Sequence, residues 1–438
     1  MTGSPRTPAD LPASVQSQPA GGGEPESAGA GERESAGPGE TQSAGSGGSD
    51  SAGSAEAVRG RTAHRFQIFL DREVARSSPL YAALTAQAAW DLDQGGPISA
   101  VLAAAPERQR IPNLFFASVQ RVLFDHPDAP LAEYYGSLGG HREPDLQLAG
   151  EFESFVLEHR ERIEQLLATR ETQTNEVLRA AQIRPALGWA RACTRRPLAL
   201  IEVGTSAGLL LHADRYEYSY EFADGSRLRG GSGSADGVPT LSCRVAGRAT
   251  AKTLGPFVTG DLPVASRVGL DLNPLDPADP EARAWLRALV WPEHAERRER
   301  LDAALAHAAR RPVRLRKGDA LRILPDAVEG VPANAIPCVF TSSSLPHWSA
   351  EGRAGFVDLV RQLGARRDLV LIMKEMHRPG LGMFTGRPDP FESEPGALPE
   401  VLGAAVYLGG QERLFRLGAG AMHGLCLDWA PAPAGDSV

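Results

Sequence analysis

The stretch Leu198–Leu211, which reads LALIEVGTSAGLLL, has the residue types of a ligand-binding loop. Its first residues, Leu198–Ile201, form an apolar run that predicts a buried strand. The candidate binding residues after that strand are Glu202, Gly204, Thr205, Ser206 and Gly208. Glycines let a backbone approach a ligand closely, and a helix beginning at Leu209–Leu211 would offer unpaired N–H groups. A strand, a glycine loop and a helix predict a crevice at the carboxyl edge of an α/β sheet.

Four more predicted strands end in polar residues. These strands are Val264–Leu270, Val313–Leu315, Cys338–Phe340 and Leu369–Met373. The polar residues that follow them include Asp271, Asn273, Asp319, Ser342–Ser344, Lys374 and Glu375. Since the carboxyl ends of parallel strands meet at one edge, we expect these side chains to line one crevice. Asp271 suits a ribose diol because a carboxylate accepts two charge-assisted hydrogen bonds, whereas Asp319 suits an adenine amino group or the cap of its own helix.

The glycine spacing separates two nucleotide-like cofactors. The dinucleotide fingerprint G-x-G-x-x-G would need glycine where Ser206 and Leu209 stand. The observed pattern E-x-G-x-x-x-G is more typical of S-adenosylmethionine binding in class I methyltransferases, which also have an acid closing each of the first two strands. We therefore predict S-adenosylmethionine as the cofactor, with Asn273 and Asp319 beside Asp271 in its site. An NAD-dependent oxidoreductase is the less favoured alternative.

The chain that must position this site divides by composition. Residues 1–60 are rich in Gly, Ser, Ala, Glu and Pro and repeat Ser-Ala-Gly from Ser27, Ser35, Ser43 and Ser51, which predicts a disordered tail. Residues 61–195 carry helical periodicity and predict an all-helical domain. Residues 196–430 alternate strands with helices and predict a doubly wound, mostly parallel sheet. The last residues, 431–438, are expected to be a second tail.

The remaining elements of the α/β region follow from the same patterns. Helical segments are expected at Glu281–Ala308, Asp319–Val328 and Ala350–Leu363. Antiparallel strands at Ala404–Leu408, Glu412–Arg416 and His423–Asp428 could complete the sheet. A long insertion, residues 209–266, contains two alternating segments, Tyr216–Phe222 and Thr240–Val245, which predict a small hairpin.

Two polar segments interrupt the helical region, Tyr134–His141 and Gln173–Glu176. Each is a turn or a helix cap, with Thr174 as the possible N-cap, or else it lies over the Gly204 loop. On the second interpretation the substrate would contact Gln173, Asn175, Asp214, Arg215 and Ser343. A general base, if the acceptor must lose a proton, would be His347, then His377 or Glu176.

Composition narrows the function classes. The formal net charge of −8 argues against a nucleic-acid or anionic-membrane partner, because both need a basic face. The four cysteines lack zinc spacing, so no metal site is predicted. Neither zinc-dependent hydrolysis nor Ser-His-Asp hydrolysis is expected. Without a secretory or membrane-spanning segment, a cytoplasmic location is the default expectation. The oligomeric state stays open.

Several motifs together resemble one known family. They are QTNE (173–176), IEVGTSAGLLLHADRYEY (201–218), GLDLNPLDP (269–277) and VWPEHAERRERLDAAL (290–305). The chain resembles the bacterial DUF2332 family of uncharacterised proteins over about Phe66–Trp429. The resemblance implies a methyltransferase-like Rossmann fold behind a helical N-terminal region, with no agreed reaction. We expect an S-adenosylmethionine-binding protein, a methyltransferase acting on an unknown small-molecule acceptor. The alternative is a catalytically degenerate binding module of the same fold.

Overall fold

The computed structural model describes residues 49–75, 77–173, 175–231, 237–389 and 397–434. The chain divides into two units, Met1–Ala57 and Val58–Val438. The repeats from Ser27, Ser35 and Ser43 in the predicted tail lie outside the described residues. Helix α1 (Ser49–Phe69) begins within the stretch expected to be disordered, and a π-helical turn, η2 (Leu70–Val74), continues it. Alanines and a valine at positions 55–58 give this part of the tail enough helix formers to extend the helix.

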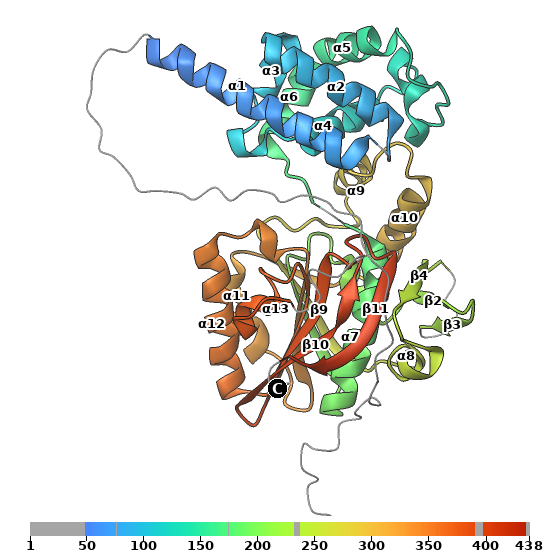
Figure 1. The fold of residues 1–438 in the computed structure, drawn as a ribbon, viewed down its shortest axis with the longest axis vertical. Helices are drawn as coiled ribbons and strands as arrows, with labels where there is room; N and C mark the ends of the chain where they lie inside the picture. The colour runs from blue at the N-terminus through green and yellow to red at the C-terminus, as the bar shows by residue number, and fades with distance from the viewer. Residues whose placement is uncertain (1–48, 76, 174, 232–236, 390–396, 435–438) are drawn as a thin grey trace, which may run out of the picture. The chain divides into compact units, whose positions relative to one another are not determined.

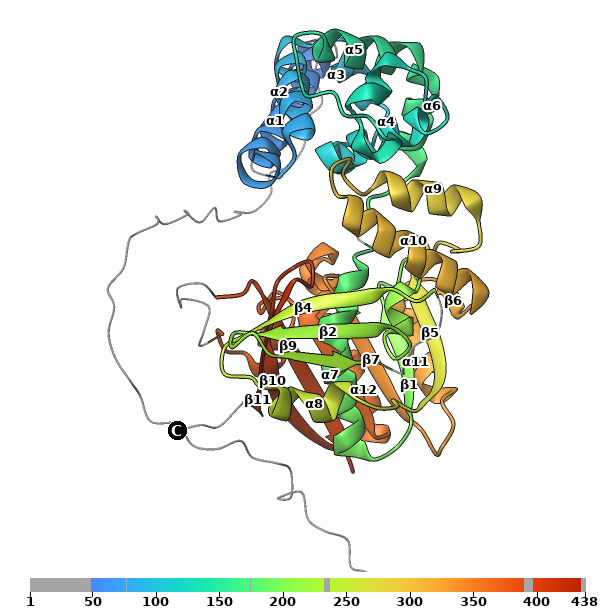
Figure 2. The same ribbon diagram turned by 90° about the vertical axis from the view of Figure 1, so that its right-hand side faces the viewer.

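Within the described residues, eleven strands form one sheet in the order β3-β2-β4-β11-β10-β9-β8-β7-β1-β5-β6 (Figure 1, Figure 2). The strands are β1 (Leu198–Val203), β2 (Glu217–Phe222), β3 (Arg227–Gly230), β4 (Thr240–Ala246), β5 (Val264–Asp271), β6 (Arg314–Lys317), β7 (Ile336–Ser342), β8 (Leu369–Glu375), β9 (Glu400–Leu408), β10 (Gln411–Gly420) and β11 (Cys426–Pro433). The five strands β6, β5, β1, β7 and β8 are parallel neighbours, and β9, β10 and β11 continue as an antiparallel meander. The predicted mostly parallel α/β sheet is confirmed, and β11 extends into the predicted C-terminal tail.

The predicted hairpin in the insertion is wrong. Both segments are strands, but β2 and β4 run parallel, with Glu217 opposite Thr240. Strand β3 forms the antiparallel pair with β2, and the chain after it returns so that β4 runs beside β2. Strand β4 also pairs with β11, so the insertion extends the main sheet. Alternation of apolar residues shows which face is buried but carries no information on strand direction.

Helices cover both faces of the parallel strands (Figure 1, Figure 2). The helices of the α/β region are α7 (Ala180–Thr194), α8 (Ala251–Val258), α9 (Pro280–Ala288), α10 (Ala295–Arg310), α11 (Ala320–Glu329), α12 (Ala350–Arg366) and α13 (Leu381–Thr385). On β1, Leu198 and Leu200 join one buried core with α7 and α10, whereas Ala199, Ile201 and Val203 join another with α11 and α12. Both faces of β1 are therefore buried, which explains its uninterrupted apolar sequence.

The region before α7 has its own hydrophobic core. Its remaining elements are α2 (Pro79–Gln94), α3 (Pro97–Leu102), η3 (Glu107–Gln109), α4 (Pro112–Leu123), η4 (Pro130–Tyr134), η5 (Gly136–Leu138), α5 (Leu148–Glu158), α6 (Arg160–Thr169) and η6 (Val177–Arg179). Trp285 of α9 is buried in this core. The predicted helix Glu281–Ala308 is broken at Pro292 into α9 and α10. There Glu293 accepts hydrogen bonds from Ser78 Oγ at 2.7 Å and Leu80 N at 3.2 Å. The WPE motif therefore attaches the α/β region to the start of α2.

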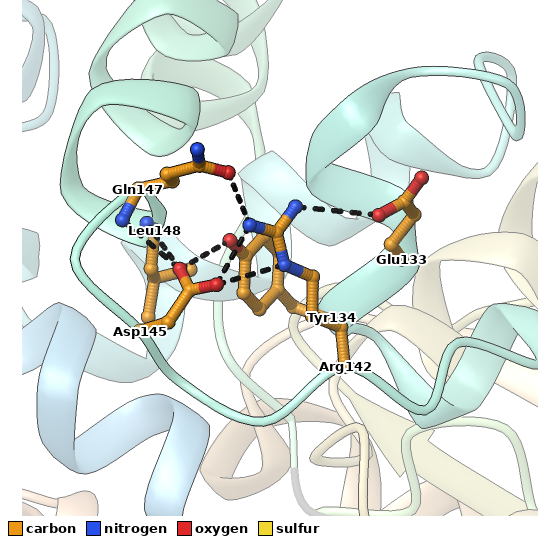
Figure 3. A network of polar contacts seen from close by, with 6 residues as sticks. All are labelled: Glu133, Tyr134, Arg142, Asp145, Gln147 and Leu148. Carbon is orange, nitrogen blue, oxygen red and sulfur yellow. Dashed lines mark hydrogen bonds and ion pairs between the residues drawn. The ribbon is translucent and has the colours of Figure 1, made fainter.

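The segment Tyr134–His141 is held inside the helical region (Figure 3). Arg142 lies between Glu133 and Asp145, and Tyr134 donates to Asp145 at 2.7 Å. The guanidinium of Arg142 also lies 4.7 Å from the centre of the Tyr134 ring. These contacts support the interpretation of this segment as a structured turn, and none of the described ones reaches the Gly204 loop.

Candidate functional site

The glycine loop lies where the strand order reverses. Strand β1 has β5 on one side and β7 on the other, and chain connections leave β1 and β7 in opposite directions along the sheet. In open α/β sheets, ligands bind at the carboxyl end of this switch point. The loop there contains three residues with positive φ: Gly204 at 79°, Ser206 at 49° and Gly208 at 70°. Glycine accepts this conformation without strain, whereas Ser206 must be held in it by its surroundings.

The expected helix after the loop is replaced by a single 3-10 turn, η7 (Leu209–His212). Asp214 pairs with Arg267 of β5, and Tyr216 donates to Leu209 O at 2.7 Å, so the chain turns at once into β2. The prediction of an α-helix here is therefore wrong. A helix macrodipole is not available at Gly204, and recognition would rest on side chains and loop N–H groups.

Asp271, at the end of β5, organises the loop. Its Oδ2 accepts the backbone N–H of Ser206 at 2.8 Å, and its Oδ1 accepts that of Asn273 at 2.8 Å. A carboxylate has about four acceptor sites, so two hydrogen bonds leave capacity for a ligand diol. After the next strand, β6, Asp319 accepts the N–H of Leu321 at 3.0 Å and caps α11. The capping alternative for Asp319 is therefore confirmed, while its second oxygen lies near exposed Arg322.

The segment Gln173–Glu176 lies over the glycine loop, as the second interpretation expects. Asn175 Nδ2 donates to Ser206 Oγ at 2.8 Å, and Ser206 Oγ donates to Gln173 Oε1. Gln173 Nε2 also donates to Asn273 O at 3.0 Å. Thr174, the proposed N-cap, lies outside the described residues. The two amide side chains thus join the loops that follow β1 and β5.

Residues 204–208 also fit the pattern G-x-S-x-G, although serine hydrolysis was not expected above. In hydrolases this pattern holds a nucleophilic serine in a strained turn after a strand, and Ser206 has such a φ. Nucleophile activation needs a neighbouring base, usually histidine. The described side-chain partners of Ser206 are Gln173 and Asn175, neither of which can take its proton.

A small polar cavity of about 20 Å³ lies beside the loop. Its walls are formed by Asn175, Glu176, Arg179, Glu202, Gly204, Thr205, Ser206, Leu209, Leu210 and Ser342. A cavity of this size holds one or two water molecules. It brings together residues at the end of β1 and in the loop after it, the end of β7, and the residues just before α7. The last group includes Glu176, one of the three predicted bases.

Burial changes the charge of the acids around this cavity. Desolvation raises the pKa of Glu202 to about 8, although the Thr205 hydroxyl, 2.7 Å away, opposes the shift. Desolvation likewise raises the pKa of Glu375 to about 7. Glu176 is instead paired with Arg297 at 2.7 Å. A carboxyl group that is protonated near neutral pH can donate a hydrogen bond, so Glu202 is a potential donor to a ligand.

Several predicted residues are placed elsewhere. Asp214 and Arg215 belong to a cluster around Arg267, which pairs with Leu200 in mid-strand rather than at the carboxyl edge. His347 is exposed in η8 (Leu345–His347). The His377 Nε2 lies 2.8 Å from Arg387 O. The two histidines are thus not among the residues that line the cavity.

The ends of β7 and β8 belong to a charged cluster, of which only Lys374 and Glu375 were named from the sequence, as strand-end residues. Lys374 is buried and pairs with Glu400 at the start of β9, and the predicted residue Ser343 donates to the same carboxylate. Arg179 donates to Met422 O at 3.1 Å and to Ser342 O at 3.4 Å. The position of Lys374 at a strand end was a signal for this cluster. Arg179 and Glu400 gave none, because their partners are distant in sequence.

Among the described residues, no group of three or more His, Cys, Asp or Glu side chains could hold a metal ion. No helix in the described part of the chain is long and apolar enough to cross a bilayer.

The comparisons with known proteins agree with the motif resemblance. No curated protein and no solved structure matches the chain. Residues 63–429 match the family model described as an uncharacterized protein conserved in bacteria, DUF2332. Because the match covers most of the sequence, and includes both the helical region and the whole described sheet up to Trp429, the chain belongs to the DUF2332 family.

Proposed function

We propose that the protein binds S-adenosylmethionine at the carboxyl edge of β1, β5 and β6 and transfers its methyl group to a small-molecule acceptor. The observation that supports this proposal is the placement of three acids at the ends of three neighbouring strands. Glu202 ends β1, Asp271 ends β5, and Asp319 follows β6. We expect Asp271 to bind the ribose and Asp319 to lie beside the adenine, with Gly204–Gly208 beside the methionine moiety.

The ribose and the methionine moiety of the cofactor each have a matching group in this arrangement. Asp271 would accept the ribose hydroxyls with the acceptor sites that its two backbone contacts leave free. Gly204 would let the methionine moiety pass close to the backbone. Gln173 and Asn175 would cover the bound cofactor, because they already cross the loop.

Methyl transfer needs alignment of donor and acceptor more than covalent help from the protein. An acceptor that loses a proton also needs a base within hydrogen-bond reach. Of the three predicted candidates, Glu176 lies in the cavity wall. Its carboxylate pairs with Arg297 at 2.7 Å, which holds it in place in that wall.

Calorimetric titration with S-adenosylmethionine and S-adenosylhomocysteine tests the proposal. We expect both to bind, and Asp271→Ala to weaken binding by about 10- to 100-fold, since hydrogen bonds to a charged group contribute about 1.5–3 kcal/mol. Asp326→Ala is the matched control, because Asp326 is exposed on α11 and pairs with Arg316 at 3.2 Å, away from the glycine loop. A folded wild-type protein that binds neither compound would refute the proposal. Binding without transfer to any acceptor would favour the degenerate binding module.

Serine hydrolysis is a second candidate, favoured by the G-x-S-x-G pattern and the positive φ of Ser206. A fluorophosphonate probe distinguishes it, because the probe labels an activated serine irreversibly. We expect no labelling, since the hydroxyl of Ser206 is bonded to two amides rather than to a base. Labelling that disappears in Ser206→Ala would reverse the ranking of the two functions.

A further inference from the structure

Arg179 is a buried cation without a carboxylate partner. Its side chain is 4% exposed, and its two hydrogen bonds go to the backbone carbonyls of Met422 and Ser342. Among the described residues, no carboxylate lies within ion-pair distance of its guanidinium. Burial lowers the pKa of Arg179, yet a guanidinium stays protonated in proteins. Buried charges are normally paired, so this one requires an explanation.

The acids that act on Arg179 have other direct partners. Glu176 is paired with Arg297, and Glu400 with Lys374. Both carboxylates, together with Glu375, favour the charged form of Arg179 from beyond ion-pair distance. Of these three cations, Arg179 is therefore the one without a carboxylate in direct contact in the described structure.

An unsatisfied hydroxyl lies in the same cavity wall. Ser342 Oγ is buried and has no hydrogen-bond partner among the described residues, and Ser342 lines the cavity together with Arg179. The cavity volume of about 20 Å³ is enough for one or two oxygen-sized groups. A guanidinium and a hydroxyl donor beside such a space match the two oxygens of a carboxylate.

A partly exposed methionine lies next to Arg179. Met422, whose carbonyl accepts hydrogen bonds from both Arg179 and Lys374, is 45% exposed. Methionine side chains adapt to varied apolar shapes and are common on binding surfaces that accept several ligands. A ligand with a carboxylate and an apolar body would fit this combination.

We propose that Arg179 and Ser342 form a carboxylate-binding subsite that orients an acidic, partly apolar methyl acceptor. The subsite lies at the ends of β7 and β1, next to the loop assigned to the cofactor. The role as acceptor site rests on the proposed methyltransferase function, whereas carboxylate binding at Arg179 does not.

The full-length protein is titrated with hexanoate and with hexanamide, an uncharged analogue of the same length, by saturation-transfer NMR. Wild type should bind hexanoate at least about tenfold more tightly than hexanamide. Arg179→Met should weaken hexanoate binding by about 10- to 100-fold and leave the amide unchanged. Arg196→Met is the matched control, since Arg196 precedes β1 and pairs with Asp368 at 2.6 Å. If Arg179→Met does not fold, Arg179→Lys should retain a preference for hexanoate, weaker than in wild type. Equal wild-type affinity for acid and amide would overturn the proposal.

S-adenosylmethionine and 5′-methylthioadenosine distinguish the acceptor from the cofactor, whose methionine part also has a carboxylate. We expect Arg179→Met to leave the affinity for both unchanged. If it weakens S-adenosylmethionine but neither methylthioadenosine nor hexanoate, Arg179 binds the cofactor and the acceptor role is overturned. If wild type binds hexanoate through Arg179 but not S-adenosylmethionine, the methyltransferase proposal fails and the carboxylate subsite is upheld.

Discussion

Replacing Lys374 with methionine should strongly destabilise the protein. The side chains of Lys374 and Glu400 are 1% and 3% exposed, and they form an ion pair at the ends of β8 and β9. Lys374→Met keeps the volume but leaves the Glu400 carboxylate buried with the Ser343 hydroxyl as its described donor. Removing one partner of a buried ion pair typically costs about 3–5 kcal/mol, because the remaining charge loses its compensation. We expect that decrease in the free energy of unfolding at pH 7.

Urea denaturation followed by circular dichroism measures the change. The double variant Lys374→Met with Glu400→Gln should recover most of the loss, because the amide removes the charge and still accepts from Ser343. Lys252→Met, on the exposed surface of α8, is the control and should change stability by less than about 0.5 kcal/mol. Desolvation lowers the folded-state pKa of Lys374 from 10.5 to about 8, so folding releases a proton in this window and wild type gains stability as pH rises through it; the cost of Lys374→Met should therefore be larger at pH 9 than at pH 7. A cost below about 1 kcal/mol at pH 7, or a double variant less stable than the single, would refute this reasoning.

Three more substitutions test the electrostatics and the loop. Burial raises the pKa of Glu202 from 4.5 to about 8, so folding takes up a proton and wild type loses stability as pH rises through this window. In thermal denaturation, the midpoint temperature of Glu202→Gln relative to that of wild type should therefore be higher at pH 8 than at pH 5. The same difference at both pH values would contradict the raised pKa. Burial lowers the pKa of His212 from 6.5 to about 3, so wild type should lose stability as pH falls below 6.5, and His212→Leu should shift the acid-unfolding midpoint downward. Gly204→Ala should cost about 1–3 kcal/mol by urea denaturation, because φ is 79° and the new Cβ would lie 2.2 Å from Ser344 Oγ; an unchanged midpoint would show that the loop relaxes freely.

The strands of the parallel sheet could be predicted because their residues are buried on both faces. Strand β1, Leu198–Val203, begins with the apolar run Leu198–Ile201 that predicted it, since no polar residue interrupts it before Glu202. The pairing of β2 with β4 was missed, because direction depends on the path of the chain between them. The covering of the loop by Asn175 was one of two interpretations of its segment, suggested by proximity along the chain to β1. The pairs of Lys374 with Glu400 and of Glu176 with Arg297 were not, because ion pairs between distant segments leave no periodic signal.

The hydrogen bonds of Ser206 with Gln173 and Asn175 affect how tightly the glycine loop can bind a ligand. In the described structure Ser206 is bonded to Gln173 and Asn175, so a ligand that needs the Ser206 hydroxyl must compete with these amides. A neutral hydrogen bond contributes a net 0.5–1.5 kcal/mol, so the two bonds weaken apparent affinity by roughly 5- to 150-fold at most. That is a penalty which a cofactor with a ribose and an adenine can offset. The same amides could instead form hydrogen bonds to the ligand. The two cases predict opposite effects of Asn175→Ala on ligand affinity. Asn175→Ala should raise the affinity for S-adenosylmethionine if the Asn175–Ser206 hydrogen bond only competes with binding. It should lower the affinity if Asn175 contacts the cofactor. We expect the lower affinity, because Gln173 joins the loops after β1 and β5, the two strands between which the cofactor would lie.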